Sequence, residues 1–178
     1  MELHWMASRR ACLLGAAWAS AWLLAACAAP PAPPAPPAPP APPTPAPSRD
    51  EQLRALGFRP TDEGWELSIA GRMLFDSDSD VLGTEGQATA DRLGRQLAQL
   101  EITRVRIEGH ADSTGSPAYN LALSLRRAQA VQRAMVAAGL RDADIQTLGL
   151  GNTAPVNDNR TPEQRQQNRR VAIVLPAQ

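Results

Sequence analysis

Residues 28–48 form a proline-rich repeat that excludes helix and sheet from that part of the chain. Proline fixes φ and has no backbone N–H to donate, so neither a helix nor a β-ladder can continue through the repeat. We expect the polyproline II conformation, in which about 20 residues at about 3.1 Å each span at most roughly 60 Å. The repeat therefore divides the 178-residue chain into an N-terminal segment and one folded domain.

The first 26 residues have the pattern of an export signal. Arg9 and Arg10 precede an apolar run of about 16 residues, which is short for a membrane span of about 20. This run ends in Leu-Ala-Ala-Cys at positions 24–27, and small residues of this kind fit a signal-peptidase site. We predict a signal peptide over residues 1–26.

The sequence around Cys27 resembles the lipobox of bacterial lipoproteins. The resemblance implies a diacylglycerol on the Cys27 sulfur, cleavage before Cys27 and acylation of the new amine, and two or more acyl chains give stable anchoring. Ala28 in place of Asp favours the outer membrane, by resemblance to enterobacterial sorting. The alternative is an ordinary secretory signal with an incidental cysteine.

The position of the repeat directly behind this anchor favours a stiff stalk that lifts a domain off the membrane. Two alternatives stay open for residues 27–48: a ligand for a proline-binding module, and a passive linker with no required length.

Composition argues against several function classes. The formal net charge is zero, so no global field favours nucleic acid. Loss of the signal leaves one cysteine, which rules out an intramolecular disulfide, and two distant histidines make a zinc site improbable. The alternating aspartates of residues 76–80 resemble a calcium loop, but Val81 and Gln87 replace its glycine and its bidentate glutamate. We expect no metal and no cofactor.

Residues 49–178 alternate between strand-like and helix-like patterns. We expect strands at 65–69, 73–75, 104–108, 145–150 and 171–175. We expect helices from a Thr84 cap to about Gln99, from a Ser116 cap and Pro117 to Gly139, and as one turn at 163–168, with a short helix or lead-in at 49–56. Such alternation indicates an α/β (α+β) domain with helices packed on one face of a sheet.

The most informative stretch is Gly-His-Ala-Asp-Ser-Thr-Gly at residues 109–115, between an expected strand and an expected helix. Amide groups at a helix start favour anions, and Asp112 adds a carboxylate beside them. Arg127 follows two to three turns into the helix, whereas its neighbour Arg126 is expected to be solvated. A carboxylate and a guanidinium so placed suit a zwitterion, because Asp pairs with ammonium and Arg takes a carboxylate bidentately. Alternatively, Asp112 closes an Asx-turn and Arg127 pairs with a nearby carboxylate.

These residues resemble the OmpA C-terminal-like domain family. The matching segments lie in the family's order: Leu74–Ser79, Asp112–Gly115, Tyr119–Asn120, Leu123–Ser124, Arg127–Ala128, Gly149–Gly151 with Pro155, and Asn168–Val171. The resemblance implies a β-α-β-α-β-β domain over residues 72–178, with a mixed sheet of about four strands. It leaves residues 49–71 as a lead-in segment that can carry an extra strand. With the lipobox, the chain is similar to the peptidoglycan-associated lipoproteins.

The resemblance implies non-covalent binding of peptidoglycan through the diaminopimelate of its stem peptide. Asp112 and Arg127 match the family positions that hold the free ammonium and carboxylate, while Thr114, Asn120, Asp76 and Arg169 match supporting positions. Asn120 is alternatively a cap or a buried amide that fixes the loop, and Arg169 a charge that precedes an apolar strand. Tyr119 is expected in the core. Ala111 departs from the threonine that the family often carries.

We therefore expect a binding and tethering protein, with its lipid in the outer membrane and its domain in the periplasm on the wall. Tol-system components are candidate partners by resemblance, and a module that docks a periplasmic protein at the sheet edge is one alternative. A wall hydrolase is the other, for which Asp112 and Glu108 would be the best acid pair. His110 alone supplies no mechanism, so we expect no enzyme.

Overall fold

The structure is a computed structural model that describes residues 47–76 and 79–177. Its elements are α1 (Arg49–Ala55), β1 (Arg59–Thr61), β2 (Gly64–Ala70), α2 (Gly71–Leu74), α3 (Thr84–Gln99), β3 (Val105–His110), α4 (Pro117–Ala137), a 3-10 turn (Asp142–Asp144), β4 (Ile145–Gly151), α5 (Pro162–Asn168) and β5 (Arg170–Pro176). The predicted signal peptide, Cys27 and nearly all of the proline-rich repeat lie outside the described residues. None of the described helices is long and apolar enough to cross a membrane.

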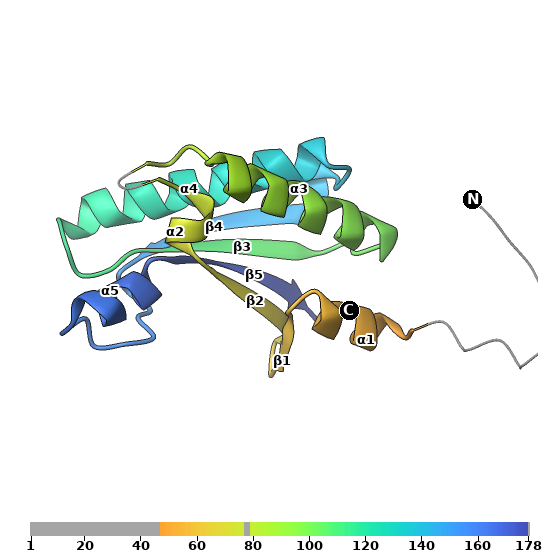
Figure 1. The fold of residues 1–178 in the computed structure, drawn as a ribbon, viewed down its shortest axis with the longest axis horizontal. Coiled ribbons are helices and arrows are strands. Elements are labelled where there is room, and N and C mark those ends of the chain that lie inside the picture. The colour runs from red at the N-terminus through yellow and green to blue at the C-terminus, as the bar shows by residue number, and fades with distance from the viewer. Residues whose placement is uncertain (1–46, 77–78, 178) are drawn as a thin grey trace, which may run out of the picture. The chain divides into compact units, whose positions relative to one another are not determined.

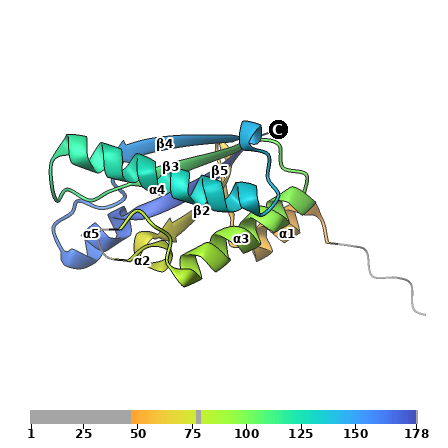
Figure 2. The same cartoon turned by 90° about the horizontal axis from the view of Figure 1, so that it is seen from above.

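Five strands form one mixed sheet in the order β1-β2-β5-β3-β4. β5 pairs antiparallel with both β2 and β3, whereas β3 and β4 are parallel and are joined through α4. Helices α3 and α4 lie side by side over the same face of the sheet (Figures 1 and 2). The predicted α/β fold is confirmed, with five strands in place of about four.

The segment before residue 72 belongs to this sheet. β2 pairs with β5 along its whole length, from Gly64 opposite Pro176 to Ala70 opposite Arg170. The additional edge strand is the three-residue β1, which forms a hairpin with β2. The lead-in segment therefore supplies an interior strand.

The strand predicted at residues 73–75 is wrong. Residues 71–74 form the helical turn α2, and Phe75 makes only an isolated bridge with Leu82. The Gly71 amide donates to the Arg169 carbonyl oxygen at 2.7 Å, and the helical turn then buries Leu74. Three consecutive apolar residues fit a strand or a helical turn equally well, so their pattern alone could not decide.

Helix α4 begins as predicted, because the Ser116 hydroxyl accepts the Tyr119 N–H at 3.2 Å and Pro117 follows it. The cap predicted for α3 is wrong by one residue, since Gly83 is its N-cap and Thr84 is already helical. At the other end of α4 the chain turns at Gly139, whose φ of +117° suits glycine.

The core lies between the sheet and the two long helices. Its largest fully buried apolar side chains are Leu74, Leu97, Ile107, Val131, Met135, Val171 and Ile173. Residues 44–178 form one compact unit, so this segment contains its own core.

Helix α4 lies directly against β3 at Gly109. A Cβ at that position would lie 1.9 Å from the Ser124 carbonyl oxygen, so only glycine permits this contact. The inner face of α4 is polar here, because Asn120, Ser124 and Arg127 are buried on it. The close approach therefore brings buried polar side chains to the end of β3.

Candidate functional site

Asp112 is at the centre of the candidate site, in the loop between β3 and α4, and only 5% of it is exposed. One carboxylate oxygen, Oδ1, accepts the Thr114 N–H at 2.8 Å, which is the Asx-turn bond considered above. The other oxygen, Oδ2, accepts a hydrogen bond from Arg169, which lies between α5 and β5. Asp112 thus stabilises its own loop through Oδ1 and pairs with a cationic side chain through Oδ2.

The charge state of Asp112 follows from these contacts. Burial by itself raises the pKa of the Asp112 carboxyl, but the Thr114 amide and the Arg169 guanidinium together outweigh burial and lower it below the usual value. The Asp112 carboxylate is therefore ionised at neutral pH and stays ionised at mildly acidic pH.

Asn120 fixes the same loop from α4. Its buried Nδ2 donates to the Asp112 carbonyl oxygen at 3.0 Å and to the Thr114 carbonyl oxygen at 2.9 Å. Asn120 is therefore a buried amide that fixes the loop, which was one of the alternatives considered for it. Gly115 has a φ of +87°, so the loop also needs glycine to reach the helix.

Ser124 ties α4 to the end of β4. Its hydroxyl accepts the Gly151 N–H at 2.9 Å, and the Gly151 carbonyl oxygen accepts the Ala111 N–H at 2.7 Å. The loop that carries Asp112 is therefore held by both α4 and β4.

Arg127 is buried on α4 and contacts the segment that follows α2. Its Nε donates to the Ser79 carbonyl oxygen at 2.9 Å, and its guanidinium lies 5.2 Å from the centre of the Phe75 ring. Arg126, expected to be solvated, is half-exposed and pairs with Asp80. The hydrogen bond from Arg126 lowers the pKa of the Asp80 carboxyl.

The predicted site residues therefore fall into two groups. Asp112, Thr114, Asn120 and Arg169 are joined directly by hydrogen bonds. Arg127 shares the buried face of α4 with Asn120, whereas exposed Asp76 lies next to Phe75 in the segment that Arg127 contacts.

One expectation around the site is wrong. Tyr119 is not in the core, since 51% of it is exposed in the first turn of α4. Leu121 is half-exposed as well. Asn120, between them, takes the inward position because the helix turns about 100° per residue.

Two asparagines near the site were missed. Asn168 is fully buried at the end of α5, and Asn159 accepts the Ser113 N–H at 3.2 Å. A recognisable signal was present, since Asn168 opens the closing motif and several asparagines gather between residues 152 and 159. Asparagine is common where the backbone must take a left-handed conformation, as Asn159 does with a φ of 64°.

Glu108 faces away from the candidate site. Gly109 points at α4, so the strand alternation directs Glu108 and His110 to the opposite face of the sheet. There the Glu108 carboxylate accepts from Arg106 at 2.6 Å. Glu108 and Asp112 therefore do not form the acid pair that a hydrolase needs.

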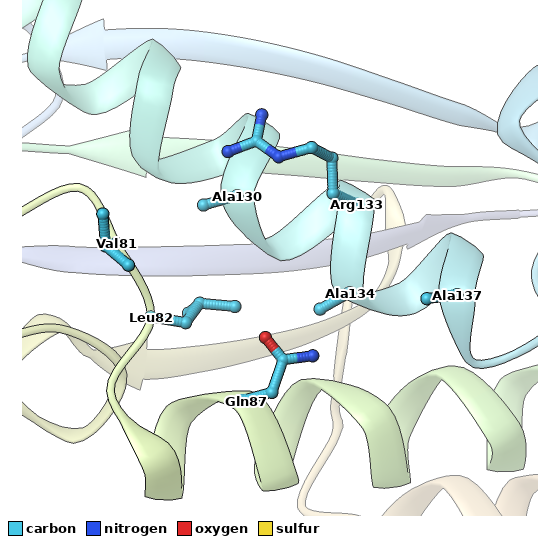
Figure 3. Close-up of a pocket in the computed structure, with 7 residues that line it drawn as sticks. All are labelled: Val81, Leu82, Gln87, Ala130, Arg133, Ala134 and Ala137. Atoms are coloured by element: carbon cyan, nitrogen blue, oxygen red, sulfur yellow. The ribbon is translucent and has the colours of Figure 1, made fainter.

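Two grooves lie elsewhere on the domain. One of about 290 Å³ lies between α4 and the start of α3 (Figure 3), lined by Val81, Leu82, Gln87, Ala130, Arg133, Ala134 and Ala137. The other, of about 460 Å³, borders β1 and β2. Across residues 47–76 and 79–177, no cluster of three or more His, Cys, Asp or Glu side chains is placed to hold a metal ion.

Comparison with known proteins shows which family the chain belongs to. The OmpA family model matches residues 74–169, which span α2 to the beginning of the closing motif and include Asp112, Asn120 and Arg127. This chain belongs to the OmpA family. The family match begins after β2, so it does not include the first two strands of the sheet.

The relatives include envelope lipoproteins from several bacteria. The outer-membrane lipoprotein YfiB of Pseudomonas aeruginosa is 41% identical over 126 residues, covering 71% of this chain and 75% of that protein. The peptidoglycan-associated lipoprotein of Rhizobium meliloti is 35% identical and covers 65% of each chain. The crystal structure of the peptidoglycan-associated lipoprotein from Burkholderia pseudomallei superposes with a TM-score of 0.53 at 33% identity, covering 60% of this chain and 87% of that one.

A fourth similarity covers more of the chain. The cell wall anchor of the type VI secretion system of Pseudomonas aeruginosa superposes with a TM-score of 0.60 at 28% identity, covering 72% of this chain and 94% of that one. These named relatives are lipoproteins and wall-associated proteins, and no catalytic family is among them.

Proposed function

We propose that this chain is an envelope lipoprotein whose domain binds peptidoglycan non-covalently through diaminopimelate and so tethers the outer membrane to the cell wall. The observation that carries the proposal is the buried, ionised Asp112 on a loop that leads into α4, which carries buried Arg127 on its inner face. The names of the relatives, two peptidoglycan-associated lipoproteins and a cell wall anchor, support the cell wall as the target.

The chemistry of the ligand matches these two charges. The free end of diaminopimelate carries an ammonium and a carboxylate, so it is a zwitterion at neutral pH. Asp112 Oδ2 accepts from the ammonium, and the Arg127 guanidinium takes the carboxylate. Thr114, Asn120 and Arg169 hold the Asp112 loop, and Asp76 borders the Arg127 side.

The anchor is the second part of the proposal. Cys27 would carry the lipid after removal of residues 1–26, and residues 27–48 would act as a stalk between the outer membrane and a domain in the periplasm. Palmitate labelling of the full chain tests this part. The wild type should be labelled and fractionate with outer membranes, whereas Cys27→Ala should do neither.

The wall contact is tested with purified residues 44–178 and isolated diaminopimelate-type sacculi. Asp112→Asn and Arg127→Ala should each abolish co-sedimentation, because removing one partner of a partly buried charge pair costs about 2–5 kcal/mol. Arg126→Ala is the matched control, since it removes the adjacent, half-exposed arginine and should leave binding intact. Sacculi with lysine in place of diaminopimelate lack the second carboxylate and should bind less.

Binding that survives both Asp112→Asn and Arg127→Ala would refute the proposed site. Release of muropeptides during the incubation would contradict a purely binding role. A periplasmic partner, such as a Tol-system component, belongs to the proposal as well, and crosslinking in intact cells would identify it.

A further inference from the structure

Asn168 uses all of its side-chain hydrogen-bonding groups inside the domain. It is fully buried, and its Oδ1 accepts the amides of Val156 at 2.8 Å and Asn157 at 3.1 Å. Its Nδ2 donates to the Asn157 carbonyl oxygen at 2.9 Å and to Asn159 Oδ1 at 2.8 Å. One side chain at the end of α5 thus fixes the backbone of residues 156–157 and the side chain of Asn159.

Asn159 passes this constraint to the Asp112 loop. Its Oδ1 accepts from Asn168 and also from the Ser113 N–H at 3.2 Å. Its own backbone is left-handed, with a φ of 64°, and its carbonyl oxygen accepts from Arg165 at 3.1 Å. Asn159 is therefore held from α5 by two bonds while it holds Ser113.

The hydrogen bond from Ser113 to Asn159 lies next to the Asp112 carboxylate. Ser113 lies between Asp112 and Thr114, and the Thr114 amide already donates to the Asp112 carboxylate. With the Ser113 amide assigned to Asn159, the two successive amides of the loop have separate acceptors. The carboxylate of Asp112 is then presented in one orientation, with Oδ2 toward Arg169.

We propose that Asn159, held by Asn168, is a positioning residue for the peptidoglycan site. It touches the loop and not the charged ligand, and it acts by fixing the backbone immediately after Asp112. The inference rests on the proposed function. Both Asn159 and Arg169 reach the Asp112 loop from residues 157–169, more than 40 positions later in the chain.

The test compares three substitutions in residues 44–178 by titration with a muropeptide that contains diaminopimelate. Asn159→Gly keeps the left-handed backbone and removes the acceptor, so affinity should fall about tenfold. Asn159→Asp keeps an acceptor for both Ser113 and Asn168 and should restore affinity to within about twofold. Asn152→Gly is the control, because it makes the same change in the same loop at a side chain with no hydrogen bond among the described residues.

Amide exchange separates positioning from general stability. The Ser113 amide should exchange faster in Asn159→Gly and recover its protection in Asn159→Asp, at a temperature well below melting. If Asn159→Gly does not fold, Asn168→Asp decides. It keeps the acceptor for the 156 and 157 amides but places a carboxylate opposite Asn159 Oδ1, so it should lose affinity in the same way.

The outcomes distinguish this inference from the proposed function. If Asp112→Asn binds the muropeptide as well as wild type, the proposed site itself is wrong. If Asp112→Asn loses binding while Asn159→Gly binds like wild type, the positioning role of Asn159 is overturned and the site stands. A loss of affinity in Asn159→Gly that Asn159→Asp fails to restore also overturns it.

Discussion

Acidification should destabilise this domain through His110. His110 ends β3 and is 3% exposed, and within the described residues neither ring nitrogen has a hydrogen-bond partner. Burial first, and the nearby Arg170 guanidinium second, lower the pKa of His110 from 6.5 to about 4. Glu108 lies 3.7 Å away but also pairs with Arg106, so it does not reverse this shift.

The direction and size of the effect follow from proton linkage. Below pH 6.5 the unfolded chain takes up a proton on His110, whereas the folded chain stays neutral there until about pH 4. The unfolded state therefore binds more protons in this window, so the free energy of unfolding falls as the pH falls. At about 1.4 kcal/mol per pH unit, the loss between about pH 7.5 and pH 5 is about 2 kcal/mol.

Urea unfolding of residues 44–178 at these two pH values measures the loss. His110 is the one histidine in that segment, and Asp80 and Asp112, with lowered pKa values, contribute mainly at lower pH. His110→Leu cannot take up a proton, so most of the difference between the two pH values should disappear. An equal free energy of unfolding for wild type at both pH values, or an undiminished loss in His110→Leu, would refute the reasoning.

Three further predictions use the same segment. Gly109→Ala places a Cβ 1.9 Å from an α4 carbonyl oxygen and should lower the free energy of unfolding by about 3 kcal/mol or more. Gly83→Ala, whose added Cβ would have its nearest atom at 3.8 Å, should lower it by less than about 1 kcal/mol, and thermal melting measures both. Leu97→Ala should lower the free energy of unfolding in urea by about 2–5 kcal/mol, because Leu97 is fully buried. Leu121→Ala should lower it clearly less, because Leu121 is half-exposed. Because the pKa of Asp112 is lowered, sacculus binding should persist at about pH 5 and fall only as the pH drops through that lowered value; loss already at about pH 6 would contradict it.

The elements that the sequence predicted well are those with a local cause. β3, β4 and β5 alternate or run apolar between turn residues, and α4 has its cap and its proline in order. The failures have distant causes. β1 has three exposed residues with no apolar pattern and is a strand only because β2 lies beside it. α2 depends on a hydrogen bond from Gly71 to Arg169, almost 100 residues away.

The same division holds within the candidate site. Resemblance singled out Asp112, Asn120 and Arg127 from one continuous stretch, and the short-range bonds of Asn120 to the loop could be expected. Resemblance also pointed to Arg169, but residue spacing could not predict its contact with Asp112, because Arg169 reaches Asp112 only when the sheet order places β5 beside β3. No spacing rule in the sequence encodes that order.

Both charges of the proposed site have protein partners in the structure. Asp112 pairs with Arg169, and Arg127 donates to the Ser79 carbonyl oxygen and lies against the Phe75 ring. A buried charge without a partner would lower the stability of the fold by several kcal/mol. Because both charges have partners, the site reduces the stability of the domain only slightly. The ligand must therefore exchange with or share existing contacts, which limits the net gain from each bond. A modest affinity per site suits a tether, because many anchored copies on one sacculus hold the two layers together through avidity.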